Sequence, residues 1–542
     1  MPASTTSNRF AHPWWSLGLL VLVTAAVYLP VTDGGFIWDD DVYVFTNPLV
    51  TDPGGLHDIW LTAESVEYYP MFYTTLWLQW KTWGMNAAGY HLVNILLHVL
   101  NVLLLWRVLR EMEVPGALLG ALLFAVHPVN VESVAWISEL KNTLSLFFFL
   151  LTGLAWLRFR RTGGRRDYVL ALAFFLAALL SKTTVVVFPV FMLGLAWWRD
   201  GAVTRRDLRL SVPFFLLALA MGLLLIWFLP HRYPSEDLLR EAGLLPRMAG
   251  AGLATWFYLA KVVFPNDLCL VYPHWDPDIR NPLMLLPMIV FLGALVLVWS
   301  RRNRWGRGIL VGVGWFWIAL LPALGIIVHP SLKQSPVADR WLYLPLMGLT
   351  ALLAAGWHRW FAQGDGVRGK TALLAAVVSV VLLAGMTFQR AELFADAETL
   401  YRETLRINPA AAGVRNNLAL VLINNGERDE AIAQLERVTA DDPGYAGAWN
   451  NLGNLVLGAG RPAEAVPILE RARELDPDGV QVKLNLGLAL AEVGRFDEAA
   501  PLLREAAAGT GNNPVILQRL GHVLVEAGRP AEAAEVLADV VR

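Results

Sequence analysis

The chain has 542 residues, of which 56% are hydrophobic and 17% charged, and it contains 23 tryptophans. This composition is more apolar than that of a soluble domain, so it predicts an integral membrane protein. The formal net charge of −2 gives no reason to expect nucleic acid as a partner. The lone Cys269 excludes an internal disulfide framework.

Apolar runs of roughly spanning length follow one another over residues 1–390. The first run, 14–30, lacks a convincing small-residue cleavage site, so we expect a retained span. The run at 115–127 is short, which favours a tilted or broken helix. The others lie at 90–110, 140–157, 168–181, 183–198, 210–229, 283–300, 308–328, 340–358 and 370–388, with an ambiguous run at 247–265.

Basic residues cluster at alternate ends of these runs, and the positive-inside rule assigns such clusters to the cytoplasm. Between the clusters at 199–209 and 301–307 the chain must cross twice, yet three apolar runs lie between them. We therefore expect 247–265 to be a re-entrant or interfacial helix. The count becomes eleven spans, with a cytoplasmic N-terminus and the C-terminal region on the outer face. The remaining basic clusters are Arg107 with Arg110, 158–166 and 359–370.

Three consecutive aspartates, Asp39, Asp40 and Asp41, follow the first span at the start of an outer loop, 31–89. Neighbouring carboxylates beside a membrane repel one another and are costly to desolvate, which is typical of a general base or a cation site. A solvated turn is the alternative. The same loop contains an aromatic segment, 60–83, which we interpret as an interfacial helix that floors a cavity at the membrane surface.

The predicted topology brings ionisable residues from five segments to the outer interface. Snorkelling, in which a long side chain extends its charge to the membrane surface, explains the position of a single lysine such as Lys182 at the interface. It explains carboxylates and imidazoles poorly, because their stems are short. For His127 and Glu132, an interhelical hydrogen-bonded pair and contact with a ligand both remain open. The five groups are 39–41, His127 with Glu132, Ser181 with Lys182, His231 with Arg232, and Asp339 with Arg340.

A period of 34 residues begins after residue 391. It is carried by Gly426, Gly460, Gly494 and Gly528, with alanines, leucines and prolines in step, although Pro514 falls three residues late. This period predicts a tetratricopeptide-repeat solenoid over 391–542, with three repeats and part of a fourth, whose concave surface binds peptide or protein.

Asparagines recur on the predicted first helices of the repeats. They either cap and pack the helices or form a ladder that holds an extended peptide backbone. These residues are Asn416, Asn417, Asn450, Asn451 and Asn485.

The motifs of the first 350 residues resemble the transmembrane and tetratricopeptide-repeat O-mannosyltransferases and their bacterial relatives. The matching segments occur in order over residues 30–350, with the repeats behind them. They are 36–40 with Asn47, 90–94 with His98, His127-Pro128 with 132–134 and Lys141, Ser181-Lys182, and 339–345.

The resemblance implies a GT-C fold and an inverting transferase that moves mannose or another hexose from a polyprenyl-phosphate carrier to protein Ser/Thr hydroxyls on the outer face. It identifies Asp39 or Asp40 as the base. Donor-phosphate or substrate contacts then fall to His127, Glu132, Lys141, Lys182, Arg340 and Asp41, with Arg232 in reserve.

The chain departs from the family pattern at four positions, which affects the assignment of phosphate ligands. Asn130 replaces a second histidine, Tyr69 an arginine, Thr183 a glutamate and Asp339 a glutamate.

Two other function classes compete with the transferase. A membrane-anchored repeat scaffold for envelope assembly would have lost catalysis. A transporter needs ionisable residues near mid-bilayer, and here they lie mainly at span ends. A Cys/His metalloenzyme is disfavoured because no cluster has ligand spacing. No resident metal is predicted, and a divalent cation bridging Asp39 or Asp41 to the donor phosphate is the alternative.

Overall fold

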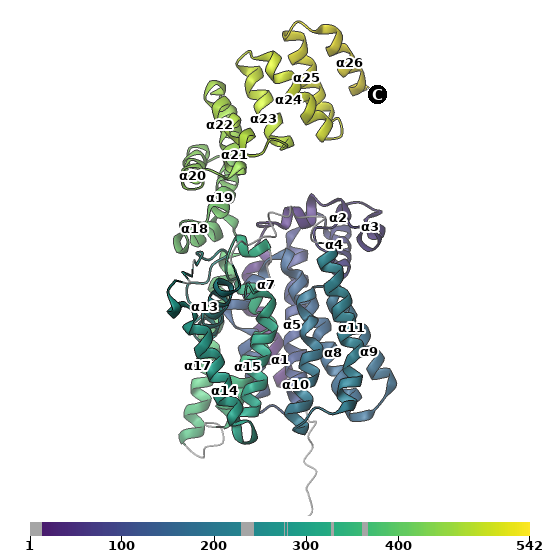
Figure 1. Cartoon of the computed structure of the whole chain (residues 1–542), viewed down its shortest axis with the longest axis vertical. Coiled ribbons are helices and arrows are strands. Elements are labelled where there is room, and N and C mark those ends of the chain that lie inside the picture. The colour runs from purple at the N-terminus through teal and green to yellow at the C-terminus, as the bar shows by residue number, and fades with distance from the viewer. Residues whose placement is uncertain are drawn as a thin grey trace, which may run out of the picture. The chain divides into compact units, whose positions relative to one another are not determined.

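The computed structural model describes residues 14–228, 243–275, 277–278, 280–326, 330–359 and 367–541. Every regular element in these ranges is a helix, so the predicted all-α fold is confirmed. The chain divides into two units, Met1–Leu400 and Tyr401–Arg542 (Figure 1).

The first unit is a bundle of apolar helices. In chain order they are α1 (Trp14–Val27), α2 (Pro48–Thr51), α3 (Gly55–Leu61), α4 (Pro70–Trp83), α5 (Ala87–Glu111), α6 (Ala117–Ala125), α7 (Val131–Ala135), α8 (Leu140–Thr162), α9 (Arg165–Leu179), α10 (Phe188–Asp200), α11 (Arg205–Phe228), α13 (Leu244–Val263), α14 (Leu286–Ser300), α15 (Arg307–Leu320), α16 (Leu346–Trp357) and α17 (Val367–Leu393). Helix α18 (Ala397–Ile407) crosses the boundary between the two units.

Six helical segments of the described chain are long and apolar enough to cross a membrane. The predicted multi-pass membrane protein is thereby supported, whereas the count of eleven spans stays a prediction. Helix α13 is not among the six, but neither are α9 and α10, so the expectation that 247–265 is re-entrant or interfacial stays a prediction. The six are Ala87–Glu111, Ile137–Thr162, Arg205–Phe228, Pro282–Ser300, Arg302–Ala323 and Val367–Leu393, and Trp14–Val27 and Leu346–Trp357 are shorter apolar helices.

The predicted broken helix is present at 115–127. Helix α6 and the segment Pro128–Ala135 meet at a bend of 53°. Pro128 has no N–H to donate and disfavours helical backbone at the residue before it, and His127 is accordingly extended, with φ −81° and ψ 124°. The bend turns α7 back toward the site described below.

The loop 31–89 folds into α2, α3 and α4, which gather at one end of the bundle beside α5 and α8 (Figure 1). Helix α4 buries Phe72, Tyr73 and Leu76 completely, in a cluster that also contains Ile137 and Leu140 at the start of α8. The opposite face of α4 carries Leu78, which is 54% exposed. This helix therefore fixes the first loop to the bundle through one apolar face.

The second unit consists of four helix pairs, so the fourth repeat is a complete pair rather than the predicted part. The pairs are α19 (Ala412–Asn425) with α20 (Arg428–Asp441), α21 (Ala446–Gly458) with α22 (Pro462–Leu475), α23 (Val480–Glu492) with α24 (Phe496–Gly509), and α25 (Pro514–Glu526) with α26 (Pro530–Val541).

The periodic glycines end the first helix of each pair in the left-handed conformation, with φ between +73° and +85°. Pro514 is out of step because it starts α25 as the first helical residue, whereas Pro443 and Pro477 lie in loops before a helix. The loop between α24 and α25 has four residues, 510–513, like the loops before α21 and α23, and it passes through Gly511 at φ +64°.

The recurring asparagines bond to one another between neighbouring repeats. Asn451 donates through Nδ2 to Asn416 Oδ1, and Asn485 donates to Asn450 Oδ1, both at 2.9 Å. These bonds match the helix-packing interpretation of the asparagines, and peptide binding by them stays a hypothesis.

Candidate active site

The loop that carries the three aspartates is held by Asp40. Its side chain is fully buried. Its Oδ2 accepts a hydrogen bond from Ile37 N at 2.9 Å, and its Oδ1 accepts one from Ser138 N at 2.8 Å. Burial raises the pKa of the Asp40 carboxyl well above its usual range, and the neighbouring Asp39 charge adds to the shift. Asp40 therefore ties the loop to the segment before α8 through both of its carboxyl oxygens.

Asp39 presents a different carboxyl group. Its Oδ1 accepts a hydrogen bond from Ser138 Oγ at 2.8 Å, and its Oδ2 accepts none from any residue that the structure describes. The side chain is partly exposed. Burial raises its pKa to about 6, although the charge on Lys141 opposes the shift. Asp39 is thus ionised at neutral pH, more basic than an ordinary aspartate and accessible through one oxygen.

The backbone before Asp39 is unusual. Trp38 has φ +53°, a conformation that residues other than glycine adopt rarely. Asp41, on the other side, accepts a hydrogen bond through Oδ1 from the adjacent Val42 N at 2.8 Å. Among the described residues it forms no ion pair with the cations described next.

Glu139 is the centre of a charged cluster that we define as Asp39, Glu132, Glu139, Lys141, Lys182 and Arg340. Its carboxylate lies 3.7 Å from Lys141 Nζ, 3.4 Å from Lys182 Nζ and 3.6 Å from Arg340 Nε. It also accepts a hydrogen bond from Asn142 Nδ2 at 2.5 Å. One buried carboxylate therefore gathers the three predicted cations from three separate segments.

Arg340 is fixed from a second side by Glu132 of α7. Its guanidinium donates to Glu132 Oε1, and its backbone N donates to Glu132 Oε2 at 3.0 Å. The guanidinium lies over the ring of Trp136, 5.3 Å from the centroid. The short 3₁₀ turn Asp339–Leu342 that carries Arg340 is thereby locked onto α7.

Lys182 and Lys141 complete the cationic side of the cluster. Lys182 donates to Asn142 Oδ1 at 2.7 Å. Burial lowers the pKa of Lys182, and the Glu139 carboxylate opposes that shift. Lys141 lies 3.7 Å from Glu67 Oε2 and 4.6 Å from the centroid of the Tyr43 ring. The Lys141, Lys182 and Arg340 side chains keep 10%, 11% and 14% of their surface exposed, so an anion can reach them.

Two predicted residues lie apart from the cluster. His127 bonds through Nε2 to Val262 O at 3.0 Å and accepts through Nδ1 from Val129 N, so no hydrogen bond joins it to Glu132. Asp339 accepts from Tyr272 OH at 2.7 Å and pairs with Arg390 at 3.3 Å. Burial raises the pKa of Asp339 to about 7. His231 and Arg232 lie outside the described residues.

Two of the departures from the family pattern meet at one contact. The hydroxyls of Tyr69 and Thr183 lie 3.2 Å apart, where the family pattern has an arginine and a glutamate. A neutral hydrogen bond thus stands in place of an opposite-charge pair. This hydrogen bond joins the start of α4 to the segment that carries Lys182.

Glu139, Asn142 and Glu67 are parts of this site that the sequence did not single out. Glu139 lies two residues before Lys141 at the beginning of an apolar run, and this position is the signal that could have found it. Asn142 and Glu67 give no comparable signal, because their roles depend on contacts with distant segments. Within the described ranges no group of three or more His, Cys, Asp and Glu side chains could hold a metal ion.

Comparison with known proteins connects this geometry with a family. Residues 69–233 match the dolichyl-phosphate-mannose-protein mannosyltransferase family. Residues 390–455, 450–514 and 490–542 match tetratricopeptide-repeat families.

Among similar proteins are protein O-mannosyl-transferases of Caenorhabditis elegans, Drosophila melanogaster and Homo sapiens, each 25% identical. The alignments cover 76%, 77% and 78% of this chain. They cover 61%, 54% and 51% of the relatives, so the chain spans little more than half of their length. A mannosyltransferase region followed by repeats confirms the resemblance of the chain to the transmembrane and tetratricopeptide-repeat O-mannosyltransferases.

Proposed function

We propose that the chain transfers a sugar from a polyprenyl-phosphate carrier to a protein hydroxyl on the non-cytoplasmic face of the membrane, with inversion at the anomeric carbon. The relatives named protein O-mannosyl-transferases favour mannose as the sugar and Ser/Thr as the acceptor. The observation that carries the proposal is the accessible Asp39 carboxylate in one charged cluster with Lys141, Lys182 and Arg340.

The reaction needs three things from the protein: a proton acceptor, an in-line acceptor hydroxyl and neutralisation of the departing phosphate. The hydroxyl oxygen bonds to the anomeric carbon as the bond from that carbon to the phosphate oxygen breaks. The hydroxyl proton goes to Asp39, and the bonding electrons leave with the phosphate. A pKa of about 6 leaves Asp39 ionised at pH 7 and raises its basicity.

The cations serve the departing phosphate. Lys141, Lys182 and Arg340 already converge on the Glu139 carboxylate, so they are ordered before a donor arrives. The donor phosphate joins them from the exposed side, as a second anion beside Glu139. Arg340 offers a planar fork for this contact, and the lysines add point charge. Asp40 acts through the loop that it holds and is a positioning residue.

The orientation follows from the charges at the two ends of α8. Lys141 begins this helix and Arg160 ends it, which separates them by about 28 Å at 1.5 Å per residue. The basic loop at 158–166 favours the cytoplasm for the Arg160 end. The charged cluster is then on the non-cytoplasmic face, where lipid-linked sugars of this kind are used.

A catalytically inactive repeat scaffold is the second candidate. The hydrogen-bonded asparagines favour a rigid solenoid that is suited to holding a partner. A scaffold gives no reason for the partly exposed Asp39 carboxylate with its raised pKa, which is why we favour the transferase.

Transfer of labelled mannose from polyprenyl-phosphate mannose to envelope proteins by the purified chain in liposomes tests the proposal. Incorporation into Ser/Thr-linked glycan supports it. Absence of incorporation, together with unchanged envelope glycans in cells that lack the chain, would favour the scaffold. Loss of transfer on chelation would support the alternative of a divalent ion at Asp39 or Asp41.

A further inference from the structure

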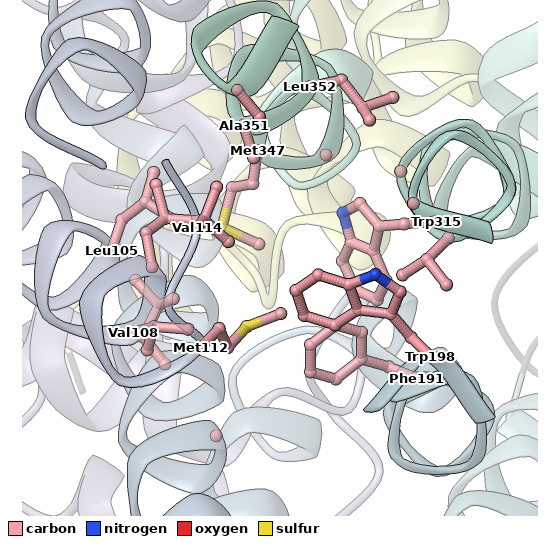
Figure 2. A pocket seen from close by; sticks show the side chains of 18 of the residues that line it. Leu105, Val108, Met112, Val114, Phe191, Trp198, Trp315, Met347, Ala351 and Leu352 are labelled. Carbon is pink, nitrogen blue, oxygen red and sulfur yellow. The ribbon is translucent and has the colours of Figure 1, made fainter. Parts of the chain in front are cut away.

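An apolar cavity of about 150 Å³ opens between α5, α8, α10, α15 and α16. In Figure 2, Leu105, Val108 and Met112 face Phe191, Trp198 and Trp315 across this space. All residues that line it are apolar or glycine. Packed protein interiors leave few voids larger than a water molecule, so a space of this size between membrane helices calls for an apolar occupant.

Gly153 of α8 shows that the space is open inside the unit. The residue is buried, yet a Cβ added to it would meet no atom within 4 Å. A buried glycine against empty space differs from Gly312 of α15, whose Cβ would collide with Leu352 at 2.3 Å. Gly312 serves helix packing, whereas Gly153 keeps the cavity free.

An arginine cleft lies on the next turns of the same helices. It is lined by five arginines, Arg107, Arg110, Arg160, Arg161 and Arg199, and by three acidic residues. On α5, Val108 lines the cavity, whereas Arg107 and Arg110 line the cleft. On α10 Trp198 lines the cavity and Arg199 the cleft.

The ion pairs in the cleft use part of this positive charge. Arg160 bonds to Asp200 at 2.5 Å and to Asp207 at 2.8 Å, and Arg161 bonds to Glu111 at 2.8 Å. Arg107 also pairs with Glu111, one turn along α5. Arg199 has no such partner among the described residues. Because the arginines outnumber the acids, the cleft still attracts an anion.

We propose that the cavity and the neighbouring cleft together bind an anionic glycerophospholipid, with one acyl chain in the apolar cavity and its phosphate at the arginine cleft. Basic pockets between membrane helices bind anionic headgroups in this way. The acyl chain fills a void that would otherwise leave the lining side chains without packing contacts. The headgroup links the C-terminal ends of α5, α8 and α10.

The sugar donor is a poorer fit to this site. Its phosphate belongs at the charged cluster beside Lys141, and the arginine cleft is at the opposite end of α8, about 28 Å away. One molecule cannot place the same phosphate at both ends. The lipid site therefore does not depend on sugar transfer.

The test is native mass spectrometry of the purified, delipidated full chain titrated with phosphatidylglycerol and phosphatidylcholine of identical acyl chains. We expect one tightly bound phosphatidylglycerol, preferred roughly 30-fold if two arginines hold the phosphate. Arg110→Gln with Arg199→Gln should remove the preference, whereas Arg165→Gln, outside the cleft, should not. Gly153→Leu should weaken the binding of both lipids. The control is Gly222→Leu, at a position where an added Cβ also meets no atom within 4 Å, and it should weaken the binding of neither lipid.

Photolabelling of the unaltered chain tests the location without relying on folding of a variant. Phosphatidylglycerol with a diazirine on its acyl chain should label peptides that contain Met112, Trp198 or Trp315. Equal binding of the two lipids, or labelling confined to the outer surface of the bundle, would overturn the proposal. Displacement of the probe by polyprenyl phosphate alone would also overturn it, because the cavity would then belong to the donor.

Discussion

Glu139→Gln should destabilise the membrane unit strongly, because it leaves three buried cations without their shared carboxylate. At about 3.5 Å and an effective dielectric of about 20, each pair has a gross Coulomb energy of roughly 5 kcal/mol. Most of this offsets desolvation, and breaking a buried ion pair by removing one partner costs about 3–5 kcal/mol. We expect a loss of unfolding free energy in that range, together with loss of donor binding as the cations separate.

Denaturant titration of the detergent-solubilised chain, followed by tryptophan fluorescence, measures this loss. Trp449 is the only tryptophan after residue 400, so the signal reports the membrane unit. Glu64→Gln, at an exposed position of the first loop, is the control and should lie within about 0.5 kcal/mol of the parent.

Adding Lys182→Met to Glu139→Gln removes one uncompensated charge, so the double variant should cost less than the sum of the single variants, by about 1–3 kcal/mol. If Glu139→Gln unfolds at the parent's denaturant concentration and the two changes are additive, Glu139 does not organise the cations.

Three further predictions concern the aspartate loop, the topology and the repeats. The pKa of Asp39 is higher in the folded than in the unfolded chain, so its ionisation should lower the stability of the parent by about 3 kcal/mol as the pH rises from about 4 to 6. Asp39→Asn should therefore unfold at a higher temperature than the parent at pH 8 but not at pH 4. Equal melting temperatures at pH 8 would contradict the raised pKa. A cysteine at exposed Glu427, with Cys269 replaced, should react with an impermeant reagent in intact spheroplasts; labelling only after lysis would refute the outer location of the repeats. Deletion of 410–542 should leave slow donor cleavage and reduce acceptor glycosylation, and full activity on the acceptor would assign the repeats another role.

Much of the fold could be predicted because its signals are periodic or local. The 34-residue glycine period predicted the helix pairs, and the short length of the run at 115–127 predicted the broken helix. The fourth pair was underestimated, although α25 begins at Pro514, 34 residues after the start of α23 at Val480 and therefore in step with the period. The number of spans could not be settled from hydropathy, since short helices such as α9 and α10 carry charged residues at their ends.

The candidate site was predictable only in its outline. Asp39, Lys182 and Arg340 were singled out by the predicted topology and Lys141 through the resemblance, and the structure brings them together. The choice between Asp39 and Asp40 depends on which carboxylate accepts the hydrogen bonds from the Ile37 and Ser138 backbone amides. The spacing of residues in the sequence does not predict this. His127 was grouped with Glu132 by proximity in sequence, whereas its hydrogen bond goes to Val262 on another helix.

The most direct test compares Asp39→Asn, Asp40→Asn and Asp41→Asn for sugar transfer from polyprenyl-phosphate mannose, with donor binding and folding measured alongside. Removing a positioned base costs about 10² to 10⁴ in rate. We expect Asp39→Asn to lose this factor while it folds and binds donor, Asp40→Asn to lose stability as well as rate, and Asp41→Asn to stay near the parent. The parent rate itself should rise with pH through about 6. Transfer by Asp39→Asn at the parent rate would contradict the assignment of Asp39 as the base.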